Sequence, residues 1–86
     1  MSLYLVIVPK KIKKAITKIP LPWQLRIIEN LRKLETNPLL GAPMQGKLKE
    51  NRKIVVWPYR IIYQIKQKQN CIIVVEVKHR GNISYG

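Results

Sequence analysis

Lys53, Arg60 and Arg80 are the residues of this sequence best suited to act on a phosphodiester. Arg60 interrupts an otherwise apolar run, where burial of a charge would be costly, so its side chain should lie in water or on a partner. Arginine stays protonated and can hold two phosphate oxygens, while lysine can move a proton where neighbouring cations or desolvation favour its neutral form. These residue types predict phosphate binding. They could also support RNA cleavage in which the neighbouring 2′-hydroxyl attacks the phosphate.

Acidic and metal-binding residues are few. The sequence has four Glu, at positions 29, 35, 50 and 76, and no Asp, so it offers neither paired carboxylates for acid–base work nor an oxygen cage for a hard cation. One histidine and one cysteine cannot complete a zinc site. A Cys–His nucleophile pair is not expected either, because Cys71 and His79 should lie roughly 26 Å apart along one strand at ~3.3 Å per residue. We therefore expect chemistry without a metal or a small-molecule cofactor, in which Lys, Tyr or His79 shares the proton transfers.

Three strands are expected to position the cations. β-branched and aromatic residues are enriched in residues 54–57, 59–65 and 71–77, and each run is bounded by a turn signal. If Pro58 and Tyr59 form a two-residue turn, Lys53 is placed opposite Gln64. Lys53 and Arg60 then lie on the same face of the sheet.

The third strand is predicted to alternate without interruption. Its alternation groups one set of side chains on one face, namely Ile72, Val74, Glu76, Lys78 and Arg80. If the turn before this strand has an even register, Lys78 and Arg80 lie on the same face of the sheet as Lys53 and Arg60. A slip of one residue would place them on the opposite face.

The remaining elements precede these strands. A short apolar run at residues 3–8 predicts a buried strand, and apolar spacing predicts helices over residues 9–19 and 22–36, followed by a loop over 39–50. We expect one α+β domain spanning residues 1–86, in which a small, mostly antiparallel β-sheet packs against an N-terminal helical hairpin. The expected order is β-α-α-β-β-β.

The charge balance points to a polyanionic partner. The sequence contains seventeen Lys and Arg but only four Glu, so its net charge is +13. Such a charge favours binding to nucleic acid or to an acidic protein. A single cysteine excludes an internal disulfide and fits a reducing compartment. The N-terminal run lacks the features of a signal peptide, and no run reaches the length of a membrane span, so we expect a cytoplasmic protein with no membrane contact.

The order of elements, together with NPLLGAPMQGKL, YRIIYQI and EVKHRGNISY, resembles the RelE/ParE superfamily of type II toxins. The resemblance implies an acidic antitoxin partner that wraps the toxin and blocks it. The RelE-like branch implies a ribosome-dependent, metal-independent mRNA endoribonuclease that acts in the ribosomal A site. The ParE-like branch implies a DNA gyrase inhibitor without nuclease activity, and a catalytically degenerate nucleic-acid-binding member is a third possibility.

The resemblance also assigns roles to five residues. Arg60 and Arg80 match phosphate and transition-state ligands, and Lys53 matches the first of two strand lysines, a candidate for proton transfer. Tyr85 matches a terminal tyrosine that stacks on a base or assists the acid–base step, and His79 matches a histidine that precedes the arginine.

The sequence departs from the family pattern at Val55, which occupies the position of the second lysine. Three of the candidate residues also have a structural alternative: Arg60 could pair with Glu76, Trp57 could cap the core, and His79 should face away from Arg80 unless the chain bends. Further RNA or phosphate contacts are expected from Lys47, Lys49, Arg52, Lys78 and Trp57.

Overall fold

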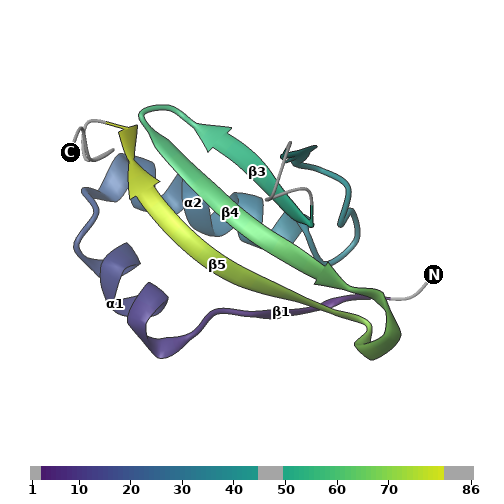
Figure 1. Ribbon diagram of the computed structural model, residues 1–86. Helices are drawn as coiled ribbons and strands as arrows, with labels where there is room; N and C mark the ends of the chain where they lie inside the picture. Colours follow the sequence, from purple (N-terminus) through teal and green to yellow (C-terminus); the bar gives the residue numbers. More distant parts are fainter. Residues whose placement is uncertain (1–2, 45–49, 81–86) are drawn as a thin grey trace.

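The computed structural model describes residues 3–44 and 50–80, and Figure 1 shows how its elements are arranged. Two helices follow the first strand, and the remaining strands follow the helices. In chain order the elements are β1 (Leu5–Ile7), α1 (Lys10–Thr17), α2 (Leu21–Lys33), β2 (Ala42–Pro43), β3 (Asn51–Val56), β4 (Tyr59–Lys66), a 3₁₀ turn (Gln67–Gln69) and β5 (Cys71–His79). The predicted α+β class is confirmed, and the very short β2 is an addition to the predicted order.

The strands form one sheet in the order β1-β5-β4-β3-β2, in which only the pairing of β1 with β5 is parallel. Both helices contribute to the core on the same face of this sheet; in Figure 1, α2 lies behind the strands and α1 lies beside β5. The core lies between them and includes Ile16 of α1, Ile27 of α2 and Ile61 of β4. No helix formed by the described residues covers the opposite face, and we call it the open face.

Local sequence explains the helices. Pro9 and Pro20 occupy the N-cap positions of α1 and α2, where their fixed φ angles fit and no backbone N–H is needed. Ile27 and Leu31 of α2 are buried, as is Leu34 at its C-cap, whereas Leu25 is 61% exposed. Among the described residues, neither helix is long and apolar enough to cross a membrane.

The β3–β4 hairpin turns at Trp57 and Pro58, whose peptide bond is cis, so Val56 pairs with Tyr59 and Lys53 with Ile62. The predicted turn at Pro58 and Tyr59 was therefore wrong. Tyr59 belongs to β4 because its ring packs with the core. The predicted pairing was displaced by two residues, which preserves the faces, so Lys53 and Arg60 do share the open face.

A β-bulge interrupts β5. Ile62 pairs with Glu76 but the next residue, Tyr63, pairs with Val74, so Val75 is the extra residue. The predicted grouping of Ile72 and Val74 with Glu76 was wrong, because Ile72 and Val74 are buried in the core. After the bulge, Glu76 and Lys78 lie on the open face, beside Ile62 and Arg60.

The segment that follows α2 is tied to the sheet by Tyr63. The buried hydroxyl of Tyr63 donates to the Pro38 carbonyl at 2.7 Å and accepts a hydrogen bond from the Gly41 N–H at 2.8 Å. A Cβ atom on Gly41 would lie 2.7 Å from the Lys53 carbonyl oxygen, so only glycine fits without a shift. This packing supports the backbone of β3 at the position of Lys53.

Candidate nucleic-acid interface

Arg60 lies on the open face close to the β3–β4 turn. Its cross-strand partners are Val55 on β3 and Lys78 on β5. Directly opposite residues have Cβ atoms about 4.5–5.5 Å apart, and diagonal neighbours are about 7–8 Å apart. Lys53, which pairs with Ile62, is a diagonal neighbour of Arg60. The sheet therefore places Lys53, Arg60 and Lys78 at adjacent positions.

Arg80 extends this group at the turn end of the sheet. Its backbone N–H donates to the Pro58 carbonyl at 2.7 Å, which holds the end of β5 against the turn. The Arg80 guanidinium carbon lies 4.6 Å from the centroid of the Trp57 ring, a cation–π contact, and Trp57 is 59% exposed. Trp57 therefore faces solvent with a cation over its ring and does not cap the core.

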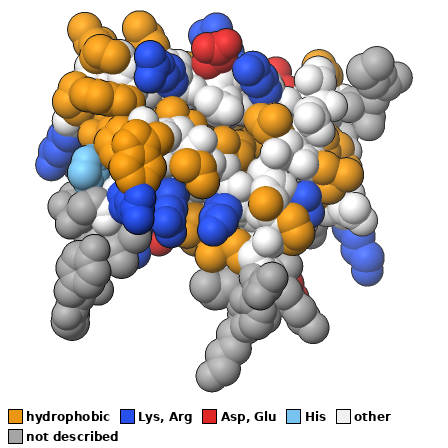
Figure 2. Space-filling model, turned by 90° about the horizontal axis from the view of Figure 1, so that it is seen from above, with side chains coloured by type: hydrophobic (Ala, Val, Ile, Leu, Met, Phe, Trp, Pro, Cys, Tyr) orange, Lys and Arg blue, Asp and Glu red, His pale blue; other side chains and the backbone are white. Residues whose placement is uncertain are grey.

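We call Lys53, Arg60, Lys78 and Arg80 the basic patch. Figure 2 looks down on the end of the molecule that carries the β3–β4 turn, and it shows Lys and Arg side chains in a row beside large hydrophobic ones. Exposed apolar and aromatic groups next to cations suit a single-stranded nucleic acid, whose phosphates bind the cations and whose bases stack.

Among the described residues, one acidic side chain forms an ion pair with the basic patch. Lys78 Nζ lies 3.2 Å from Glu76 Oε1, and the other ion pair among the described residues, Lys33 with Glu29, is on α2. Neither Arg60 nor Lys53 has a side-chain hydrogen bond or ion pair with another described residue. The alternative in which Glu76 neutralises Arg60 is therefore not the arrangement in this structure.

His79 lies on the helix-covered face, away from the basic patch. It pairs with Tyr59, and their rings meet edge to face with centroids 5.0 Å apart. Both residues line a pocket of about 460 Å³ together with Lys18 and Val77. The structure thus keeps the alternation that separates His79 from Lys78, and within the described chain no bend brings the imidazole to the patch.

The other predicted contacts differ in their placement. Arg52 is engaged with backbone, because its Nε donates to the Gly41 carbonyl at 2.8 Å and its Nη2 to the Leu39 carbonyl at 3.4 Å. Its observed contacts stabilise the loop before β2. Three further predicted residues lie outside the described residues, namely Lys47, Lys49 and Tyr85.

Sequence reasoning missed an amide pair on the open face. Asn51 and Gln64 face each other across β3 and β4, and Gln64 Nε2 donates to Asn51 Oδ1 at 2.7 Å. The observed register, applied to the sequence, gives this pair. Lys53 pairs with Ile62, and Asn51 lies two residues before Lys53 while Gln64 lies two residues after Ile62.

The chemistry available to the patch is that of fixed cations. In residues 3–44 and 50–80, no three His, Cys, Asp or Glu side chains lie together in a way that could hold a metal ion. Two arginines and two lysines can bind phosphate and neutralise charge that develops on its oxygens.

A family model described as the ParE toxin of the type II toxin–antitoxin system parDE matches residues 6–83. The chain therefore belongs to the ParE toxin family, within the RelE/ParE superfamily of type II toxin–antitoxin systems. The resemblance inferred from the sequence is confirmed.

Solved structures share the fold. The toxin–antitoxin complex RelBE2 from Mycobacterium tuberculosis matches with a TM-score of 0.80 and 22% identity, covering 91% of this chain and 99% of that one. The archaeal RelE–RelB complex from Pyrococcus horikoshii matches with a TM-score of 0.76 and 25% identity, covering 93% and 98%. The isolated RelE toxin from Escherichia coli matches with a TM-score of 0.76 and 18% identity, covering 88% and 83%. A search of curated proteins found no match.

Proposed function

We propose that this toxin binds mRNA in the ribosomal A site through the basic patch and cleaves it without a metal. The observation that carries the proposal is Arg60, which has no anionic partner among the described residues and has Lys78 directly opposite and Lys53 at a diagonal position on the open face. Like charges at adjacent sheet positions destabilise the free protein, so a bound polyanion would be favoured there.

In the proposed reaction the 2′-oxygen attacks the adjacent phosphorus, and the bond from phosphorus to the 5′-oxygen of the next nucleotide breaks. The products are a 2′,3′-cyclic phosphate and a free 5′-hydroxyl. The 2′-hydroxyl loses a proton and the leaving oxygen gains one. Arg60 and Arg80 would hold the non-bridging oxygens, whose charge increases in the transition state, while Lys53 would take part in proton transfer.

Other groups could complete the proton transfers. Glu76 lies on the open face but is already paired with Lys78, and His79 lies on the opposite face. The family resemblance assigns an acid–base or stacking role to Tyr85, and this assignment remains a prediction. Trp57 offers an exposed ring close to Arg80 on which a base could stack.

We further propose that an acidic antitoxin neutralises the toxin by covering this cationic surface. Two supports are the net charge of +13 and the crystal structures of RelE-like relatives from Mycobacterium tuberculosis and Pyrococcus horikoshii, which are toxin–antitoxin complexes. The complex should therefore weaken as salt is raised.

A second candidate function is inhibition of DNA gyrase without nuclease activity. Two observations favour it: the matching family model is that of the ParE toxin, and Val55, at the position where the resemblance implies a second lysine, lies opposite Arg60 with 56% exposure. This function predicts DNA breakage while mRNA stays intact.

The two functions are separated by inducing the toxin and mapping mRNA 5′ ends by primer extension, with DNA breakage measured in parallel. New ends that disappear in an Arg60→Ala/Arg80→Ala variant would support the nuclease. The matched control is Arg26→Ala/Arg32→Ala, which removes two exposed arginines of α2. Growth arrest with intact messages would reject the nuclease, and an absence of arrest would favour a degenerate member of the family.

A further inference from the structure

Aliphatic side chains lie together on the open face, along β1 and the adjoining part of β5. They form what we call the apolar strip, which consists of Leu5, Ile7, Ile73 and Val75. On β1, Val6 packs against the core, so alternation places Leu5 and Ile7 on the open face, where Leu5 is 67% exposed. On β5, Val74 is buried in the core, so its neighbours Ile73 and Val75 point to the open face, and Val75 is 41% exposed.

The apolar strip is continuous because β1 and β5 are paired. Ile7 is the direct partner of Ile73, and the two strands run side by side in Figure 1. Val75 follows two residues after Ile73 on β5. Single exposed apolar residues are common on protein surfaces, but a contiguous apolar group bordered by charges is typical of an interaction surface.

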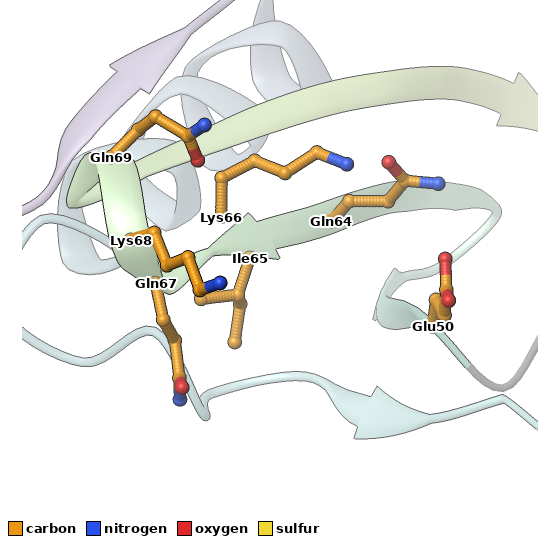
Figure 3. A pocket seen from close by; sticks show the side chains of 7 residues that line it. All are labelled: Glu50, Gln64, Ile65, Lys66, Gln67, Lys68 and Gln69. Atoms are coloured by element: carbon orange, nitrogen blue, oxygen red, sulfur yellow. The ribbon is translucent and has the colours of Figure 1, made fainter.

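Cations border the apolar strip on its β4 side. The row of paired residues that begins at Leu5 continues through Cys71 to Lys66, and Figure 3 shows Lys66 on the same side of β4 as Gln64. No ion pair joins Lys66 to another described residue. The basic patch lies towards the other end of the strip, where Arg60 is six residues before Lys66 on β4, roughly 20 Å away at ~3.3 Å per residue.

This combination of groups fits an acidic protein better than a nucleic acid. Bases stack on aromatic rings and on arginine, whereas the strip offers aliphatic side chains, which gain most by burial against apolar side chains of a partner. A second copy of this chain would bring two net charges of +13 together, and these repel each other. A partner that carries apolar side chains next to carboxylates matches both the strip and the cations.

We propose that the apolar strip and the cations beside it form one docking surface for an amphipathic helix of an acidic protein. Apolar side chains along one face of the helix would pack on the strip, and carboxylates on the adjacent face would meet Arg60 and Lys66. The strip lies on a face of the sheet, which a helix can cover, whereas an added strand needs a sheet edge. A helix rises about 1.5 Å per residue, so about 13 residues span the distance between these cations.

The proposal rests on the acidic antitoxin of the proposed function, but it does not require cleavage. It differs from a purely electrostatic contact because the strip, which carries no charge, contributes to affinity and selects an amphipathic partner. A helix bound in this way would cover Arg60 and so compete with RNA for the basic patch.

The test measures binding of the purified toxin to fluorescently labelled synthetic peptides by anisotropy. One peptide of about 18 residues, made of Leu, Ala and Glu, places its leucines on one helical face, and a second has the same composition in scrambled order. We expect the wild-type protein to bind the amphipathic peptide about tenfold more tightly than the scrambled one, the scale of burying one large apolar side chain.

Leu5→Thr/Val75→Thr removes apolar contacts at two exposed strand positions and introduces residues that favour strands, so the fold should be kept. This variant should lose the preference for the amphipathic peptide. The matched control is Leu25→Gln, which changes an exposed leucine of α2 and should retain the preference. Lys66→Ala should weaken peptide binding more than Lys11→Ala, which removes one exposed charge of α1.

A labelled 2′-O-methyl uridine oligomer, which cannot be cleaved by 2′-hydroxyl attack, separates the strip from the RNA site. The wild type and Leu5→Thr/Val75→Thr should bind it equally, and equal binding also shows that the variant is folded. Weaker oligomer binding by the variant, with an unchanged melting curve, would assign the strip to RNA and overturn the proposal. A wild-type dimer that dissociates in the variant would assign the strip to a second copy and overturn it as well.

The peptides themselves can also overturn the docking surface. Equal wild-type binding of the two peptides, no binding of either, or a preference that survives Leu5→Thr/Val75→Thr would each do so. Failure of the docking surface differs from failure of the proposed function. Uncut messages together with a strip-dependent preference would remove the cleavage and keep the docking surface. Salt-sensitive peptide binding that depends on Arg60 but not on the strip would keep the antitoxin contact and remove the docking surface.

Discussion

Replacement of Arg60 by alanine should separate activity from stability. Removing one preorganised group that stabilises developing charge costs about 10²–10³ in rate, so we expect a loss of that size in cleavage. The fold should not suffer, because Arg60 makes no ion pair or side-chain hydrogen bond with another described residue. Lys78 lies directly opposite Arg60 and Lys53 diagonally to it, so the substitution also relieves repulsion. The free energy of unfolding should stay within about 0.5 kcal/mol or rise slightly.

The assay is single-turnover cleavage of mRNA on programmed ribosomes, with urea unfolding measured on the same preparations. Arg60→Lys serves as the matched variant, because it keeps the positive charge but cannot hydrogen-bond two phosphate oxygens in the bidentate way of arginine. Its activity should fall between those of the wild type and Arg60→Ala. Arg26→Ala, on the exposed surface of α2, controls for the loss of one positive charge. A loss of less than tenfold in Arg60→Ala, or an equal loss in Arg26→Ala, would refute the reasoning.

Three further outcomes follow from the same geometry. Tyr63→Phe leaves the Gly41 N–H without its partner, so urea unfolding should show a loss of about 1–3 kcal/mol, and an unchanged midpoint would contradict this. Val55→Lys places an ammonium opposite Arg60 at an exposed position, and it should raise the cleavage rate in the ribosome assay; an unchanged or lower rate would contradict a role for a lysine there. In titrations of single-stranded RNA at several salt concentrations, Arg60→Ala should reduce the slope of log K against log salt by about 0.7, and an unchanged slope would place the phosphate elsewhere.

The sequence was sufficient for the fold class, because period-2 and period-3.6 patterns in a short chain leave few alternatives. It was also sufficient for the shared face of Lys53 and Arg60, although the hairpin turn was placed one residue too late. Moving the turn by one residue displaces the pairing by two, and side chains alternate with a period of two. The error in register therefore left the faces unchanged but hid the pairing of Asn51 with Gln64.

The placement of Arg52 could not be predicted from sequence, since it depends on a loop that folds back on β3. An arginine at the start of a strand, near other cations, fits a phosphate contact as well as a structural one. The structure shows its side chain bound to the carbonyls of Leu39 and Gly41. Tertiary hydrogen bonds to backbone leave no pattern in the sequence, whereas burial of apolar residues does.

The bulge at Val75 is the feature of β5 that the sequence concealed, because valine fits a regular strand as well as a bulge. Without an extra residue, alternation would place Lys78 on the same face as Ile72 and Val74, so either the cation would enter the core or the apolar pair would leave it. Burial of an unpaired ammonium costs several kcal/mol. The extra residue reverses the alternation at this point, so one strand can supply the core at its start and the basic patch, opposite Arg60, at its end.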